Sequence, residues 1–211
     1  MKKLILGLLL ASPFLAYGQI GVKAGLNFSN VSNTSSISHS NETGYNVGVF
    51  LAPKSKSIIS SKTELILSKQ GYNYSTNSQD GTADLLYIML PTYMCINITR
   101  FFQIHLGAQM AYLINAKADS TNTAGGTDPF ADAVQYYNRF DYGFGGGVEV
   151  HPFKGLLIGA RMNISLAELY SDAASGKIPS LASVNVKQNL FQLYAGWHFG
   201  KQPPSSKKKQ E

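Results

Sequence analysis

Apolar and polar side chains alternate along residues 138–168 in two runs, which a short segment at 151–155 separates. From 140 to 150 the even positions are apolar or aromatic except for Gly146, and the odd positions are small, polar or charged. Successive side chains of a β-strand point to opposite faces, so this period of two predicts a strand. His-Pro-Phe-Lys-Gly at 151–155 predicts a tight turn. Residues 156–166 repeat the alternation, and the whole segment predicts a β-hairpin with one apolar and one polar face.

The two faces of this hairpin differ as they do in a strand that crosses a membrane. The apolar face is long and bulky, whereas the polar face carries glycines and the opposite charges of Glu149 and Arg161. In a transmembrane barrel the apolar face meets lipid and the polar face meets the lumen. A soluble lipocalin-like barrel is the alternative, but it would turn the glycine-rich charged face to water and is therefore disfavoured.

The same alternation recurs in six further segments. They are 19–28, 43–52, 58–74, 85–98, 101–115 and 187–199. With the hairpin they predict an all-β fold, an eight-stranded antiparallel up-and-down transmembrane β-barrel over residues 19–199. Connections after the first, third, fifth and seventh strands are long and polar, and the others are short turns, which is typical of bacterial outer-membrane barrels with external loops and periplasmic turns.

Two positions need separate comment because they test the predicted pairing. Pro91 faces inward in its strand and lacks an amide hydrogen, so we expect a bulge or a missing hydrogen bond there. Asn115 falls on the inward face at the end of the fifth strand if the alternation is unbroken.

The ends of the chain differ from the barrel in composition. Residues 1–18 combine a basic start, an apolar run from Leu4 to Leu15 and small residues before Gln19, which predicts a cleaved signal peptide and export. Residues 200–211 hold no apolar residue to bury and predict a disordered basic periplasmic tail. The net charge of +6 lies mainly in these ends, so a nucleic-acid surface is excluded.

The inward face of the predicted barrel carries charges of both signs. Lys23 and Arg161 are basic, and Glu64, Asp141 and Glu149 are acidic. Eight strands enclose an interior just wide enough for side chains to fill, and buried charges are tolerated when they are paired. We therefore predict a structural network of ion pairs and amides that plugs the lumen.

Five segments resemble the PorT-like outer-membrane barrels of Bacteroidota-type bacteria. They are GVKAGLNFS at 21–29, ELILSKQGY at 64–72, YIMLP at 87–91, FDYGFGGGVEV at 140–150 and LIGARMNISLAEL at 157–169. The resemblance covers nearly the whole mature chain and implies an eight-stranded outer-membrane barrel; one group of that family serves a protein-secretion and gliding apparatus. Members commonly carry an acid before the Ile/Leu-Pro of the fourth strand, where this chain has Met89, while the acid of the third strand is present as Glu64.

Histidine and cysteine give little support for a metal site. His105, His151 and His198 face inward near the periplasmic end, and imidazole is a common zinc ligand. However, the last strand is not a neighbour of the strands that carry the other two histidines, so we expect hydrogen-bonded lumen histidines and no metal. Cys95 is the only cysteine, which excludes an intrachain disulfide and a thiolate zinc cluster.

A hydrolase is the enzymatic alternative. His39 with Asp119, Asp128 or Asp172 would supply a base and its orienting carboxylate near the outer rim. Because no spacing selects these residues, we expect no catalytic residue, no cofactor and no enzyme activity.

The pattern as a whole favours a structural or interaction protein of the bacterial outer membrane, and the resemblance to PorT-like barrels implies a role accessory to a secretion system. Its expected partners are outer-membrane lipid and a protein that contacts the external loops or the basic tail. A narrow channel for small solutes is the alternative from the transport class.

Overall fold

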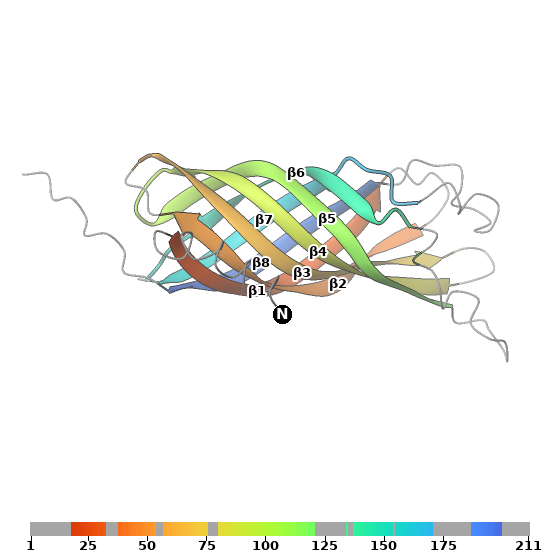
Figure 1. Ribbon diagram of the computed structural model, residues 1–211. Helices are drawn as coiled ribbons and strands as arrows, with labels where there is room; N and C mark the ends of the chain where they lie inside the picture. The colour runs from red at the N-terminus through yellow and green to blue at the C-terminus, as the bar shows by residue number, and fades with distance from the viewer. Residues whose placement is uncertain are drawn as a thin grey trace, which may run out of the picture.

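The computed structural model describes residues 18–32, 38–53, 57–75, 80–120, 134, 137–153, 155–170 and 187–199. These residues form a closed barrel in which strands adjacent in sequence pair antiparallel. The strands are β1 (Gly18–Ser32), β2 (Ser38–Pro53), β3 (Ile59–Ser75), β4 (Asp80–Asn97), β5 (Phe102–Ser120), β6 (Phe140–Val150), β7 (Leu156–Ser165) and β8 (Lys187–Phe199). The barrel closes where β1 pairs with β8, from Ile20↔Phe199 to Ser32↔Lys187, and the predicted eight-stranded fold is confirmed (Figure 1).

An exposed apolar belt surrounds the barrel. Large outward side chains such as Leu26, Leu90 and Met162 keep about half of their surface exposed, at 50%, 49% and 50%. A contiguous apolar surface of this size is not stable in water, but it matches the lipid-facing band of a transmembrane barrel. The prediction that the bulky face points outward is thereby confirmed. No helix within the described ranges is long and apolar enough to cross a membrane.

Aromatic side chains gather at both ends of this belt. Phe101, Phe153, Trp197 and Phe199 are exposed at the end with the short turns, and Tyr45, Tyr112, Phe140 and Tyr142 are exposed toward the other end. Amphipathic aromatic rings favour the interface between lipid and water, so two girdles are expected at the membrane boundaries.

Several strands are longer than the sequence pattern predicts. β2 begins at Ser38 rather than 43, β4 begins at Asp80 rather than 85, and β5 ends at Ser120 rather than 115. The added residues are polar or small, without a large apolar side chain, so the alternation of bulky apolar and polar residues does not mark them. The backbone ladder defines the strands there. At the end opposite the short turns, β4 and β5 thus project past β6 and β7 (Figure 1). The connections after β1 and β3 are shorter than predicted.

Asn115 does not face the lumen, and this prediction is wrong. The β4–β5 register passes from Leu86↔Asn115 to Tyr87↔Leu113, so Ile114 has no partner and forms a β-bulge. The extra residue reverses the alternation, and Asn115 becomes exposed while Ala116 is buried.

Pro91 interrupts the ladder between β4 and β3. The β3–β4 pairs pass from Thr63↔Thr92 to Ile66↔Met89 without a change of register, and the two positions between them are unpaired. Proline has no amide hydrogen to donate, so the ladder is interrupted at Pro91, as predicted.

Candidate functional site

The middle of the lumen is organised around the carboxylate of Glu64 on β3. Arg161 on β7 reaches it across the barrel and donates two hydrogen bonds, Nη1 to Oε2 at 2.8 Å and Nη2 to Oε1 at 3.0 Å. Lys23 on β1 donates to Oε2 at 2.7 Å, and Lys62 Nζ lies 3.6 Å from Oε1. These charged side chains are at most 2% exposed, so one carboxylate serves three buried cations.

A second carboxylate, Glu149 on β6, lies next to this centre. Lys62 donates to its Oε2 at 2.7 Å and so connects the two carboxylates. The hydroxyl of Tyr194 donates to the same oxygen at 3.1 Å. His105 Nε2 lies 3.9 Å from Oε2, and His151 Nε2 lies 3.1 Å from Oε1.

Aromatic rings fill the space between these charges. The guanidinium of Arg161 lies 4.0 Å from the ring centroid of Tyr93 and 5.0 Å from that of Tyr194. Lys62 Nζ lies 4.5 Å from the ring centroid of Phe50. Such cation–π contacts stabilise a desolvated cation and at the same time close the cross-section of the barrel.

A layer of amides continues the network toward the longer-loop end. Asn27 receives hydrogen bonds from Asn46 at 2.8 Å and Gln192 at 3.0 Å, and it donates to Ser68 at 2.8 Å. Asn163 donates to Gln192 at 3.2 Å. All five side chains are buried, and their mutual bonds compensate for the water that they lose.

Three tyrosines cross the lumen above the amide layer. The Tyr72 hydroxyl lies 2.8 Å from that of Tyr137 and 2.5 Å from that of Tyr170. Tyr137 and Tyr170 also form a backbone bridge between the segments that flank β6 and β7. Tyr72 belongs to a buried apolar cluster with side chains such as Leu85 and Leu113, so this end of the lumen is packed rather than open.

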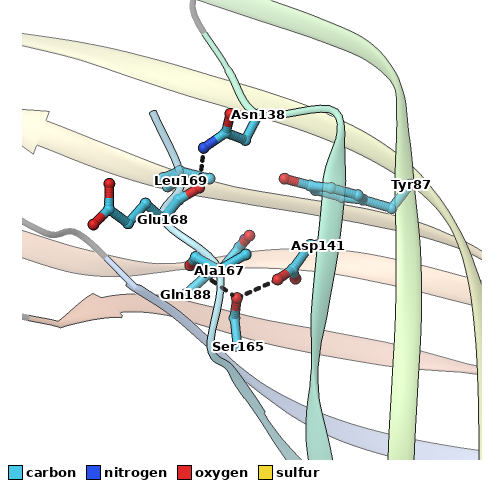
Figure 2. A pocket seen from close by; sticks show the side chains of 8 residues that line it. All are labelled: Tyr87, Asn138, Asp141, Ser165, Ala167, Glu168, Leu169 and Gln188. Carbon is cyan, nitrogen blue, oxygen red and sulfur yellow. Dashed lines mark hydrogen bonds between the residues drawn. The ribbon is translucent and has the colours of Figure 1, made fainter. Parts of the chain in front are cut away.

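Asp141 lies apart from the ion-pair network. It accepts a hydrogen bond from the hydroxyl of Ser165 and lines a small pocket. Figure 2 shows Asp141 and Ser165 pointing at one another, with the Tyr87 hydroxyl and the Gln188 amide nearby. Asp141 was predicted to join Lys23, Glu64, Glu149 and Arg161 in one network. The structure brings only those four together.

The histidines are closer together than strand order implies. The ring centroids of His151 and His198 are 5.8 Å apart, so the prediction that strand order separates them is wrong. The barrel is narrow enough for inward side chains of β8 to meet those of the turn after β6. Together with Glu149 these two histidines offer three ligand atoms that all lie within 4.8 Å of one another.

The side chains of the candidate hydrolase residues lie outside what the structure describes. Asp128 and Asp172 lie outside the described residues, and only the backbone is described for His39 and Asp119. Cys95 is a free thiol with 1% exposure. The predicted signal peptide, apart from Gly18, and the tail 200–211 also lie outside the described residues.

Sequence reasoning missed Lys62, Tyr93 and Tyr194 as members of the network. Lys62 lies two positions before Glu64 in the same strand and therefore faces the same way, so the alternation could have identified it as a lumen residue. The role of the two tyrosines as ring partners of Arg161 leaves no signal in the sequence, because it depends on which strands face one another across the lumen.

Comparison with solved structures finds several similar proteins. Neisserial surface protein A is 13% identical over 85% of this chain and 97% of its own, with a TM-score of 0.51. Ail of Yersinia pestis is 14% identical over 87% and 99%, with a TM-score of 0.49. OprG of Pseudomonas aeruginosa is 11% identical over 88% and 97%, with a TM-score of 0.45. Comparison with curated proteins gives no significant match.

A family model decides the assignment. The model of the outer membrane protein beta-barrel domain matches residues 12–171, which is most of the chain. The closed barrel agrees with the description of this family, and β8, which lies outside the matched residues, completes the barrel. The chain therefore belongs to the outer membrane protein beta-barrel domain family and is a protein of the bacterial outer membrane.

Proposed function

We propose that this protein is a structural or interaction protein of the outer membrane and that its barrel is plugged rather than conducting. The observation that carries the proposal is the occupied cross-section of the lumen. Arg161 reaches from β7 to Glu64 on β3, and Lys62 reaches from β3 to Glu149 on β6. A solute could pass only if these buried ion pairs separated or if the aromatic rings packed beside them were removed.

The energetics of the plug support the same conclusion. Breaking a buried ion pair by removing one partner costs about 3–5 kcal/mol, because the other charge remains desolvated. Transient opening of several linked pairs would cost more, so spontaneous conduction is disfavoured. The side chains of the network are also connected to the amide layer through Tyr93, which donates to Asn163 at 3.1 Å.

A partner protein would then contact the parts of the chain outside the barrel. The external loops and the basic tail 200–211 are the proposed contact surfaces, and lipid surrounds the apolar belt. The PorT-like resemblance suggests a role as an accessory of a secretion apparatus. Met89 departs from that family at the acidic position of the fourth strand; here it is buried, and Gln70 contacts its sulfur at 3.4 Å.

Reconstitution into planar lipid bilayers tests the plugged lumen. We expect the refolded protein to give no discrete current steps under conditions in which a general porin conducts. Replacing Tyr93 and Tyr194 together by serine removes two rings from the plug without leaving a charge unpaired, so this variant is expected to conduct. Tyr142→Ser is the matched control, because Tyr142 faces lipid with 49% exposure.

Discrete and reproducible openings of the unmodified protein would contradict the proposal. They would favour the alternative, a narrow channel for small solutes. Heat-modifiable migration on gels shows for each variant that the barrel is folded, so a silent variant is interpretable.

A further inference from the structure

Glu149, His151 and His198 form a compact group at the short-turn end of the lumen. Glu149 is the penultimate residue of β6, His151 follows that strand directly, and His198 is the penultimate residue of β8. Their three ligand atoms lie within 4.8 Å of one another. Tetrahedral zinc with bonds of about 2.0–2.1 Å separates its ligands by roughly 3.4 Å, so modest side-chain rotations bring the three to bonding positions.

Two side-chain atoms of this group that could ligate a metal are buried without a hydrogen-bond partner among the described residues. They are Oε1 of Glu149 and Nδ1 of His198. Oε1 lies 3.1 Å from His151 Nε2, but no well-directed hydrogen bond joins the two atoms. Glu149 is fully buried, and the contact made by its Oε1 is the ion pair with His151. Nδ1 of His198 is a buried nitrogen without a hydrogen-bond partner in the described part of the chain, which is costly unless something occupies the space that it faces.

We propose that these three residues bind a divalent transition metal ion of the class that prefers imidazole, with zinc as the representative. Two imidazole nitrogens and one carboxylate oxygen, with a fourth position open to water, are a ligand set used by zinc. Calcium and magnesium are disfavoured because they require more oxygen ligands.

Lys62 would share the Glu149 carboxylate with the proposed ion. Lys62 occupies the other oxygen of Glu149, Oε2, at 2.7 Å, so the two oxygens are divided between the ammonium and the metal. This second contact fixes the orientation of the carboxylate, as hydrogen bonds to metal-binding carboxylates commonly do. Lys62 also repels the ion, so we expect micromolar rather than nanomolar binding.

The position of His151 gives the ion a way in. Its side chain is 17% exposed and lies in the turn 151–155, at the mouth of the barrel. The ion would therefore exchange with the compartment that the short turns face and would not pass through the plugged lumen.

Calorimetric titration of the tag-free, refolded protein with zinc chloride tests the site. We expect one zinc ion per chain and a loss of affinity of at least about tenfold in His151→Ala and in His198→Ala. Cobalt provides an independent spectroscopic readout, because a tetrahedral cobalt site absorbs strongly in the visible region. That band is expected for the unmodified protein and absent for the His151→Ala, His198→Ala double variant.

His39→Ala is the matched control, since it removes one histidine from β2 at the opposite end of the barrel. It should bind zinc like the unmodified protein. The absence of stoichiometric zinc uptake would overturn the proposal, and so would equal affinity in the His39 and His198 variants. Heat-modifiable migration confirms that each variant is folded before titration.

Discussion

Glu64 determines the charge balance of the lumen at the scale of single residues. With the histidines counted as neutral, the buried network contains the cations Lys23, Lys62 and Arg161 and the anions Glu64 and Glu149. Cations therefore exceed anions by one. Removing a cation brings the network to neutrality, whereas removing Glu64 leaves three cations with a single carboxylate.

Paired substitutions at one ion pair make this asymmetry measurable. We expect Glu64→Gln to lower the free energy of unfolding by about 3–5 kcal/mol, because three buried cations lose their shared partner. Lys23→Met should cost less, about 1–3 kcal/mol, since Glu64 keeps both hydrogen bonds from Arg161. Urea unfolding in lipid vesicles, followed by the fluorescence of Trp197, measures both. Equal costs, or a larger cost for Lys23→Met, would refute the charge-balance argument.

The alternation of odd and even positions in a strand predicts which face of the sheet a residue occupies. It does not predict how deep along the barrel axis the residue lies. Lys23, Glu64, Glu149 and Arg161 were assigned to the lumen from alternation alone, and they meet there. Asp141 was assigned by the same reasoning, yet it contacts Ser165 beside a separate pocket. Depth depends on strand tilt and on the stagger of the pairs around the barrel, and these quantities are not encoded in any single strand.

The glycines of β6 have a packing role at the scale of the strand. Gly146 and Gly147 are adjacent in sequence and point to opposite faces. A Cβ added to Gly147 would lie 2.8 Å from the Cα of Arg161 on β7. A Cβ added to Gly146 would point toward lipid, with its nearest atom, the carbonyl oxygen of His105, at 3.3 Å.

Alanine substitutions at these neighbouring positions should therefore differ. Gly147→Ala pushes β7 away from β6 and moves Arg161 relative to Glu64, so we expect a loss of stability of about 1–3 kcal/mol or more. Gly146→Ala should stay within about 0.5 kcal/mol of the unmodified protein. The urea midpoints of the two refolded variants provide the comparison. Similar midpoints would show that the contact between β6 and β7 relaxes at little cost.

Strand extent and strand irregularity were the least predictable features at this scale. The segments 80–84 and 116–120 were expected to be loops because they hold no large apolar side chain, but they continue the ladder of β4 and β5. The bulge at Ile114 has no mark in the sequence, since an apolar residue fits the regular pattern equally well. The interruption at Pro91 was predictable because proline lacks the amide hydrogen that the ladder uses.

The narrowness of the barrel governs contacts at the scale of the whole molecule. Side chains from strands that are not neighbours meet in the lumen, as Arg161 of β7 meets Glu64 of β3. Strand order therefore identifies backbone pairs but does not exclude contacts between distant strands. His151 and His198 are an example. Strand order suggested that these two side chains do not meet, but their ring centroids are 5.8 Å apart.

Closure of this narrow barrel depends on the seam between β1 and β8, which a disulfide can test. Ala24 and Ala195 are paired across the seam, and Cα atoms of paired residues lie about 4.5–5.5 Å apart, within disulfide range. A24C with A195C, in a Cys95→Ala background, should oxidise readily and change the migration of the boiled, non-reduced protein. A24C with L193C is the matched control, because diagonal neighbours are about 7–8 Å apart and beyond that range. Equal oxidation of both pairs would show that the seam slips in register. The plug would then lack a fixed geometry, because its residues come from β1 and β8 as well as from the middle strands.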